Sequence, residues 1–420
     1  MKNSDKFKLN ERYLIFLIQR KIPLILFFGV LLIFLRQVDY FIDPRFWAEE
    51  ATIYFKNAYD TKSLKNFFTP QLGYYSLYNQ IAAYIALLVP LKYAPFVTTT
   101  ISVVPIYLVF YLSIVTRNSY LRTFEQRVIF ATLMILISSG EIWLNTITSQ
   151  FWFALCVLLI IIDRRPHSIQ IKIFYAAVVF MASLTGVIAL FLIPLAIALI
   201  IFFKENHKNV KFILDFLIAG LVVQVILILI FGFNFGVNDL SQIQGGARFD
   251  SFNMLEMIKS FIGYYFLYPF TGVALYDYSI VIYGLYGSVL ILTTSYLIFI
   301  NFNKKIGLIL AYCINFSLLT MVLSVGGNGG LRYAFLVNAL FLIIFISFLN
   351  CKNKVQLNVV RVILALTILT GIVEYKIKLN NFSNVKWLSW QEQFSPHEKR
   401  SNKLIVWPQS PHIWSVYLKK

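Results

Sequence analysis

Acidic residues are few in this chain, and three of them lie close together after the first long apolar run. The stretch DPRFWAEE contains Asp43, Glu49 and Glu50, whereas the whole chain of 420 residues has only 19 Asp and Glu. A carboxylate in such a place can act as a general base and take the proton from an acceptor hydroxyl as it attacks an activated carbon. Adjacent residues project about 100° apart on a helix. Glu49 and Glu50 therefore cannot both face one cavity, and the sequence does not choose between them.

The same stretch also has a purely structural interpretation. Asp43 is suited to the N-cap of a helix, and Pro44 to its first position, where the missing N–H is not needed. Apolar residues then recur at helical spacing, which predicts a short amphipathic helix along the membrane surface with Trp47 as an interface anchor. In that case the acids form a solvated face that the helix dipole favours.

Arginines near the outer ends of the predicted spans could stabilise a leaving phosphate. An oxocarbenium-like sugar carbon with a phosphate leaving group is one carbon that such a base could serve, and guanidinium is the best-shaped cation for the phosphate. Arg332 and Tyr333 follow a glycine-rich loop in GGNGGLRYAFLVNALF, Arg248 lies in QGGARFDSF, and Arg45 lies beside the acids. We predict that these four residues bind the donor phosphate. The alternative for Arg332 is snorkelling to the interface.

Polar and aromatic residues on the same side could bind a sugar acceptor. We assign this role to Trp47, to Glu141, Asn145 and Gln150 in GEIWLNTITSQ, and to Trp414 near the C-terminus. Indole faces suit sugar rings as well as the membrane interface. Helix capping and loop solvation are the alternative explanation for the three polar residues.

The composition indicates an integral membrane protein. Hydrophobic residues make up 59% of the chain, charged residues only 13%, and the mean hydropathy is +0.72. The net charge of +18 is scattered in short clusters between apolar runs, where Lys and Arg act as topology signals and not as a nucleic-acid footprint. The three cysteines and four histidines show no ligand spacing, so neither a disulfide framework nor a metal site is indicated.

The apolar runs predict an all-α polytopic bundle of about eleven transmembrane helices. The basic loops fall on the cytoplasmic side when the N-terminus is inside, which leaves the tail outside. The expected spans are 22–37, 96–116, 128–139, 151–162, 173–184, 187–203, 212–233, 279–300, 306–324, 331–348 and 359–373.

We expect a single membrane domain over residues 1–420. Its non-spanning parts are the cytoplasmic N-terminus (1–21), the first periplasmic loop with the acidic motif (39–74), an interfacial or re-entrant helix (75–90), a second periplasmic loop (236–278) and the periplasmic tail (374–420). Residues 75–90 carry Asn79, Gln80 and several tyrosines, and a full crossing there would place the next arginine-rich loop outside.

Several stretches together resemble the GT-C class of multi-pass glycosyltransferases, within it the O-antigen-modifying, serotype-converting (Gtr-type) glucosyltransferases of bacteria and phages. They are DPRFWAEE, NTITSQFWFAL, SLTGVIALFLIPLAI, GGNGGLRYAFLVNALF and the tail segment IVWPQSPHIWSVYL. The resemblance places the acidic motif on Glu49 and Glu50, with Asp43 as a third member. Related motifs often read Glu-Asp-Gly, whereas this chain has Glu-Glu-Ala, which leaves the identity of the base open.

The resemblance implies an inverting hexosyltransferase of the bacterial inner membrane with its active site facing the periplasm. Its donor would be a polyprenyl-phosphate sugar, with glucose the expected sugar, and its acceptor a hydroxyl of O-antigen or another envelope glycan. It also implies the lipid bilayer, a flippase and a sugar-loading synthase as partners, and no nucleic acid. No cofactor is implied, and a divalent metal stays open.

Two alternatives stay open at this point. A lipid-linked sugar flippase or other transporter would use the outer acids and Arg332 for binding only, and it would need polar groups near mid-membrane. Gln224 is the clearest such residue in this chain. An O-antigen polymerase shares the outer-face sugar chemistry and differs in its product.

Overall fold

The computed structural model is mostly helical. It describes residues 21–61, 63–71, 73–165, 168–203, 207–231, 254–272, 280–323, 330–380, 389–394, 403–406 and 415–418. Two predicted site residues, Arg248 and Trp414, and most of the predicted loop 236–278 lie outside the described residues.

Long apolar helices make up most of the bundle. They are α6 (Ala94–Val115), α11 (His207–Phe231), α14 (Ile280–Ile300), α15 (Lys304–Leu323), α16 (Gly330–Ser347) and α17 (Lys354–Asn380). Within the described residues, five helical segments are long and apolar enough to cross a membrane: Leu91–Val115, Lys208–Phe231, Lys304–Val322, Gly330–Asn350 and Lys354–Val373. The chain therefore has the character of a membrane protein.

Shorter apolar helices complete the bundle: α7 (Phe124–Ile137), α8 (Ser149–Ile161), α9 (Ile169–Ser183) and α10 (Ile193–Phe202). Each of the eleven expected spans overlaps a helix, counting helical residues 21–36, but eleven crossings stay a prediction. The 13 residues of α8 cover roughly 20 Å against a hydrocarbon core of about 30 Å. Because every residue of α8 is buried, protein and not lipid surrounds this helix.

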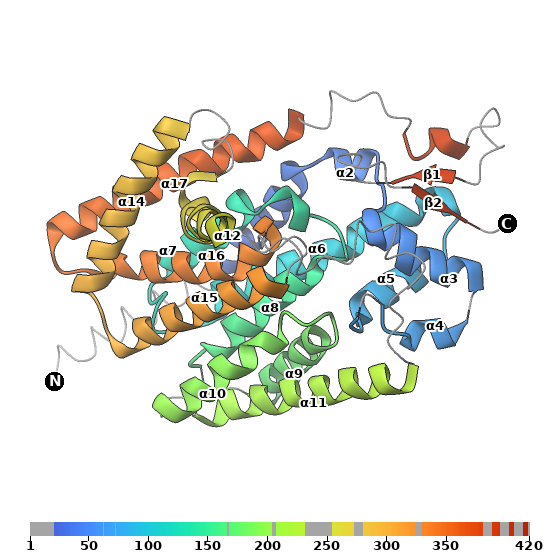
Figure 1. Cartoon of the computed structure of the whole chain (residues 1–420), viewed down its shortest axis with the longest axis horizontal. Coiled ribbons are helices and arrows are strands. Elements are labelled where there is room, and N and C mark those ends of the chain that lie inside the picture. The colour runs from blue at the N-terminus through green and yellow to red at the C-terminus, as the bar shows by residue number, and fades with distance from the viewer. Residues whose placement is uncertain are drawn as a thin grey trace.

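The elements that do not span gather at one end of the bundle (Figure 1). They include α2 (Asp39–Ile42), the π-helix η1 (Glu50–Phe55), α3 (Lys56–Thr61), α4 (Leu64–Phe68) and α5 (Leu77–Ala86). The 3₁₀ and π segments elsewhere are η2 (Leu91–Tyr93), η3 (Gly140–Ile142), η4 (Leu190–Leu192), η5 (Phe261–Leu267), η6 (Phe348–Asn350) and η7 (Glu392–Phe394). The short helix α12 (Met254–Ser260) directly precedes η5. With ten residues, α5 is too short to cross a bilayer; its interfacial placement stays a prediction.

The C-terminal tail adds one small feature that the all-α prediction omitted. Strands β1 (Lys403–Ile405) and β2 (Ser415–Tyr417) form an antiparallel pair in which Lys403 lies opposite Tyr417. Trp390 is fully buried with Phe46 and the inner residues of this hairpin. The tail therefore packs on the first loop, more than 300 residues away in sequence.

Candidate functional site

The acidic stretch begins its helix later than predicted. Asp43 caps the C-terminal end of α2 and not the start of the next helix, so its assignment as an N-cap is wrong. Ala48 has a φ of 30°, a conformation that costs an alanine about 1–3 kcal/mol, and the π-helix η1 follows at Glu50. The Glu50 side chain turns back and accepts a hydrogen bond from the backbone N–H of Trp47 at 3.0 Å, as the acid of a capping box does.

Asp43 and Arg45 serve the packing of this loop. Arg45 is buried and donates to the Asp43 carboxylate from Nε at 3.1 Å and from Nη2 at 2.9 Å. The other Asp43 oxygen accepts the backbone N–H of Trp390 at 2.9 Å, and the Trp390 indole donates to the carbonyl of Leu91 at 3.2 Å. These contacts explain why Asp43 does not cap the start of the next helix, and they engage Arg45 with a carboxylate of the protein.

Glu50 joins the first loop to the loop that precedes α8. Its second oxygen accepts the backbone N–H of Thr146 at 3.1 Å and the Thr146 hydroxyl at 2.6 Å. The side chain is buried, and burial raises the pKa of Glu50 above its ordinary value, while hydrogen bonds from Thr146, Trp47 and Thr98 oppose the rise. Burial and the hydrogen bonds from Trp47 and Thr146 favour a structural role for Glu50.

The loop that holds Thr146 is also strained. Leu144 has a φ of 50°, the second non-glycine residue with a positive φ among the described residues. Asn145 is used within this loop: its Nδ2 donates to the carbonyl of Glu141 at 2.9 Å, and its Oδ1 accepts the backbone N–H and the hydroxyl of Thr148. Asn145 therefore shapes the turn into α8, which matches the capping alternative and leaves little capacity to bind an acceptor.

Glu49 faces a different environment. It is partly exposed and makes no hydrogen bond among the described residues, but it interacts electrostatically with Tyr54, Tyr74 and Arg332. The Arg332 guanidinium also interacts with the exposed Glu141. None of the described carboxylates forms an ion pair with Arg332 at contact distance. The structure thus places Glu49 and Glu141 close enough to Arg332 to interact electrostatically, without a contact ion pair among the described residues.

Aromatic and amide side chains border this group. Arg332 lies over the ring of Tyr333, 5.1 Å from its centroid, and Tyr333 contacts Phe151 edge to face. Gln150 donates to the Tyr74 hydroxyl at 3.4 Å. Burial raises the pKa of Tyr74 to about 12, so this phenol keeps its proton near neutral pH and can donate it to a bound oxygen.

The turn with the sequence SLTG (183–186) packs against the Gln150 side chain. Gly186 has a φ of 81°, and a Cβ at this position would meet the Gln150 amide oxygen at 2.1 Å. Neither the backbone conformation nor the space accepts a side chain here. Gly186 in turn donates its N–H to the carbonyl of Tyr75 at 3.1 Å, which fixes the backbone next to Tyr74.

Gln224, the polar residue within the α11 span, organises the same region. Its Oε1 accepts the N–H of Tyr75 at 2.9 Å, and its Nε2 donates to the carbonyls of Tyr75, Ser183 and Gly186 at 3.0–3.1 Å. Both ends of the amide are therefore occupied by backbone groups of two irregular segments. The residue that a transporter could have used as a mid-membrane binding group is thus a structural one.

Four important residues escaped the sequence analysis. Tyr54 and Tyr74 interact electrostatically with Glu49, and Thr146 donates to Glu50. Arg36 is buried over the Trp143 ring at 4.1 Å and donates to the carbonyls of Ile135 and Ser138 at the end of α7. No local pattern in the sequence marks these residues, because each depends on a partner from a distant segment.

The predicted site residues therefore divide into two groups. Glu49, Arg332, Tyr333, Glu141 and Gln150 lie around one region, whereas Asp43, Arg45, Glu50 and Asn145 are engaged in loop packing. Trp47 is half-buried at the start of the acidic turn. Within the described parts of the chain, no three His, Cys, Asp or Glu side chains are grouped as metal ligands.

Comparison with known proteins adds no assignment. No family model matches the chain, no curated protein is significantly similar to it in sequence, and no solved structure matches its fold.

Proposed function

We propose that the chain is an inverting glycosyltransferase of the bacterial inner membrane that moves a sugar, glucose first among the candidates, from a polyprenyl-phosphate carrier to a hydroxyl of an envelope glycan. The observation that carries the proposal is the placement of the Glu49 carboxylate near Arg332, at the end of the bundle where the non-spanning elements gather. A base and a phosphate-binding cation are the two groups that this reaction needs most.

Glu49 is the better candidate for the base. It is partly exposed, and among the described residues nothing fixes its carboxylate by a hydrogen bond, whereas Glu50 is buried and accepts hydrogen bonds from Trp47 and Thr146. A general base must reach the acceptor hydroxyl. In the proposed reaction Glu49 takes the proton of the acceptor hydroxyl. The oxygen of that hydroxyl then bonds to the anomeric carbon of the sugar from the face opposite the leaving group. At the same time the bond from the anomeric carbon to the phosphate oxygen breaks, and the polyprenyl phosphate leaves.

Arg332 is suited to the phosphate of the donor. It lies in the first turn of α16, where the helix dipole already favours an anion. Its cationic group lies over the Tyr333 ring, and it forms no ion pair at contact distance with a described carboxylate. Tyr74 and Gln150 can supply further hydrogen bonds to sugar or phosphate oxygens.

The test compares purified wild type with Glu49→Gln and Arg332→Gln, using polyprenyl-phosphate glucose as donor and isolated O-antigen as acceptor. Loss of the base lowers kcat by roughly 10²–10⁴-fold and keeps donor binding, whereas Arg332→Gln weakens donor binding. Glu125→Gln is the matched control, because Glu125 is an exposed acid in the first turn of α7, away from the site.

Each of the other outcomes points elsewhere. Full activity of Glu49→Gln would remove Glu49 as the base. Wild-type protein that transfers nothing from any lipid-linked sugar but moves such a lipid across vesicles would favour the flippase, and growth of a polymer in place of a single branch would favour the polymerase.

A further inference from the structure

A large cavity lies at the end of the bundle opposite the acidic loops. Helix α8 begins beside Glu50 and its partner Thr146, and α16 begins near Arg332; both run to the other end, where the loop after α8, the end of α16 and the neighbouring connections line an open cavity of about 630 Å³. The segments that line it are the α6–α7 turn, Arg164 in the loop after α8, the end of α10, the α14–α15 turn and the end of α16. This volume is within the range of small-molecule and cofactor sites.

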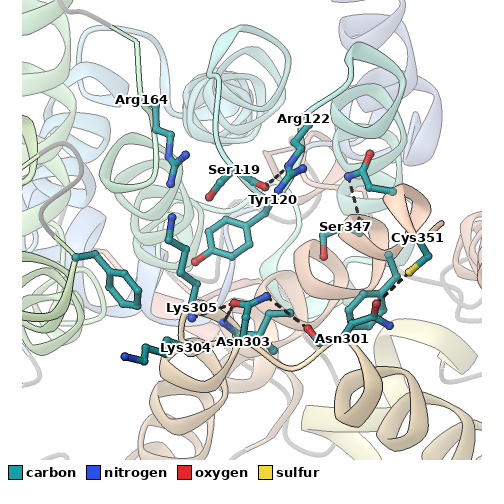
Figure 2. Close-up of a pocket in the computed structure, with 14 residues that line it drawn as sticks. Ser119, Tyr120, Arg122, Arg164, Asn301, Asn303, Lys304, Lys305, Ser347 and Cys351 are labelled. Atoms are coloured by element: carbon teal, nitrogen blue, oxygen red, sulfur yellow. Dashed lines mark hydrogen bonds between the residues drawn. The ribbon is translucent and has the colours of Figure 1, made fainter.

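The charge around this cavity has one sign. Its described lining contributes four basic residues, Arg122, Arg164, Lys304 and Lys305, and no acidic one. Figure 2 shows the Lys305 side chain extending toward Arg164 from the opposite wall. Like charges that converge repel each other, and an anion between them converts that repulsion into attraction.

Neutral hydrogen-bonding groups complete the lining. Ser119, Tyr120 and Ser347 bring hydroxyls, and Asn303 brings an amide whose Oδ1 already accepts the backbone N–H groups of Lys305 and Ile306. Cations for phosphate oxygens and hydroxyls for neutral oxygens are the set that recognises a phosphate ester with a polar headgroup.

Topology alone does not explain this arrangement. A cytoplasmic excess of Lys and Arg orients a membrane protein without any need for a cavity. Other basic residues of the same end serve the loops themselves: Arg127 donates to the carbonyls of Ile114 and Thr116 at 2.9 and 3.0 Å, and Arg165 pairs with Asp163 at 3.0 Å. The four basic residues of the cavity, of which Arg122 also donates from Nε to the carbonyl of Ser119 at 3.0 Å, come from three separate segments and meet around one space.

We propose that this cavity binds a phosphate ester, supplied either by the headgroup of an anionic membrane lipid or by a water-soluble molecule. Its position at the ends of apolar helices suits basic pockets that hold anionic lipids. The proposal is independent of the transferase function, because it concerns the opposite end of the bundle and a binding event only.

The test uses the full chain, delipidated in neutral detergent, and measures binding of three probes: phosphatidylglycerol in mixed micelles, phosphatidylcholine in mixed micelles, and glycerol 3-phosphate in solution. Wild type is compared with two triple variants that each remove three positive charges from the same end. The cavity variant carries Arg164→Gln, Lys304→Gln and Lys305→Gln; the matched control carries Lys208→Gln, Lys211→Gln and Lys354→Gln at exposed positions outside the lining.

We expect phosphatidylglycerol to bind wild type and the control alike, and the cavity variant about tenfold or more weakly, because each charge-assisted contact contributes roughly that factor. Glycerol 3-phosphate binding with the same dependence would support a phosphate ester from the water-soluble source. Equal binding by the cavity variant and the wild type, or an equal loss in the control, would overturn the proposal. Because phosphatidylcholine carries a phosphate diester without net charge, equal affinity for it would overturn the anionic lipid as the source. Melting temperatures measured without probe establish that each variant is folded. If the triple cavity variant does not fold, the single variant Lys305→Gln takes its place.

Discussion

The contact between Glu50 and Thr146 predicts that a threonine with no catalytic function controls the position of Glu49. Thr146→Val removes the hydroxyl that donates to the Glu50 carboxylate at 2.6 Å and keeps the shape of the side chain. Leaving a buried acceptor without one of its donors costs about 1–3 kcal/mol. Because the Thr146 backbone N–H still donates at 3.1 Å, we expect a loss in that range and not unfolding.

The same substitution should lower transfer. Glu49 is adjacent to Glu50 and follows the strained residue Ala48, so a loosened Glu50 lets the whole turn relax. A displacement of about 1 Å at a reacting group can cost roughly 10²-fold in rate. We therefore expect Thr146→Val to reduce kcat by about 10–100-fold, less than Glu49→Gln.

The assay combines reversible unfolding in mixed micelles with transfer kinetics, for Thr146→Val, Glu50→Gln and the double variant. A real contact gives a coupling energy of about 0.5–3 kcal/mol in this cycle. Thr100→Val is the control: Thr100 is exposed and its hydroxyl donates to Phe96 within α6, so the change should stay within about 0.5 kcal/mol. Additive single effects and wild-type kinetics in Thr146→Val would refute the reasoning.

Three further predictions follow from buried contacts. The raised pKa of Glu50 means that the folded protein binds this proton more tightly than the unfolded chain does. The resulting contribution to stability is present below the ordinary carboxyl pKa and is lost as the pH rises through the raised pKa. The difference in unfolding free energy between wild type and Glu50→Gln, measured from pH 4 to 8, should therefore fall by at most about 1.4 kcal/mol per pH unit. Trp390→Ala empties a buried indole site and leaves the Leu91 carbonyl without the indole N–H that it accepts, which should cost about 3–5 kcal/mol and make the tail sensitive to trypsin while wild type resists. Gln224→Leu leaves the N–H of Tyr75 without its acceptor and removes the donor to the carbonyls of Ser183 and Gly186, at about 1–3 kcal/mol for each polar group left without a partner; an unfolding free energy like that of wild type would contradict this role.

The helices of this chain could be predicted because their signal is local. Apolar runs and basic loops locate α6, α11, α15, α16 and α17 to within a few residues. The irregular ends could not be predicted in the same way. The local sequence alone indicates an N-cap at Asp43. In the fold its Oδ1 instead accepts the backbone N–H of Trp390, which belongs to the distant C-terminal tail.

The candidate site shows the same division. Glu49, Glu141 and Arg332 could be nominated from residue type and predicted side of the membrane, since costly charges near apolar spans are conspicuous. Tyr74 and Thr146 could not, because a tyrosine or a threonine in such a chain is ordinary and gains its importance only from Gln150 or Glu50.

The adjacent acids also limit what an activity measurement alone can establish. If Glu50 holds the loop and Glu49 takes the proton, neutralising either one lowers transfer, and kinetics of the two glutamine variants cannot separate the roles. Stability can. Glu49 is partly exposed without a fixed partner among the described residues, so Glu49→Gln should leave the unfolding free energy within about 0.5 kcal/mol of wild type, whereas Glu50→Gln should change how that free energy depends on pH. An inactive Glu49→Gln that is also destabilised would place Glu49 in the packing of the loop, and the base would then have to be sought at Glu141.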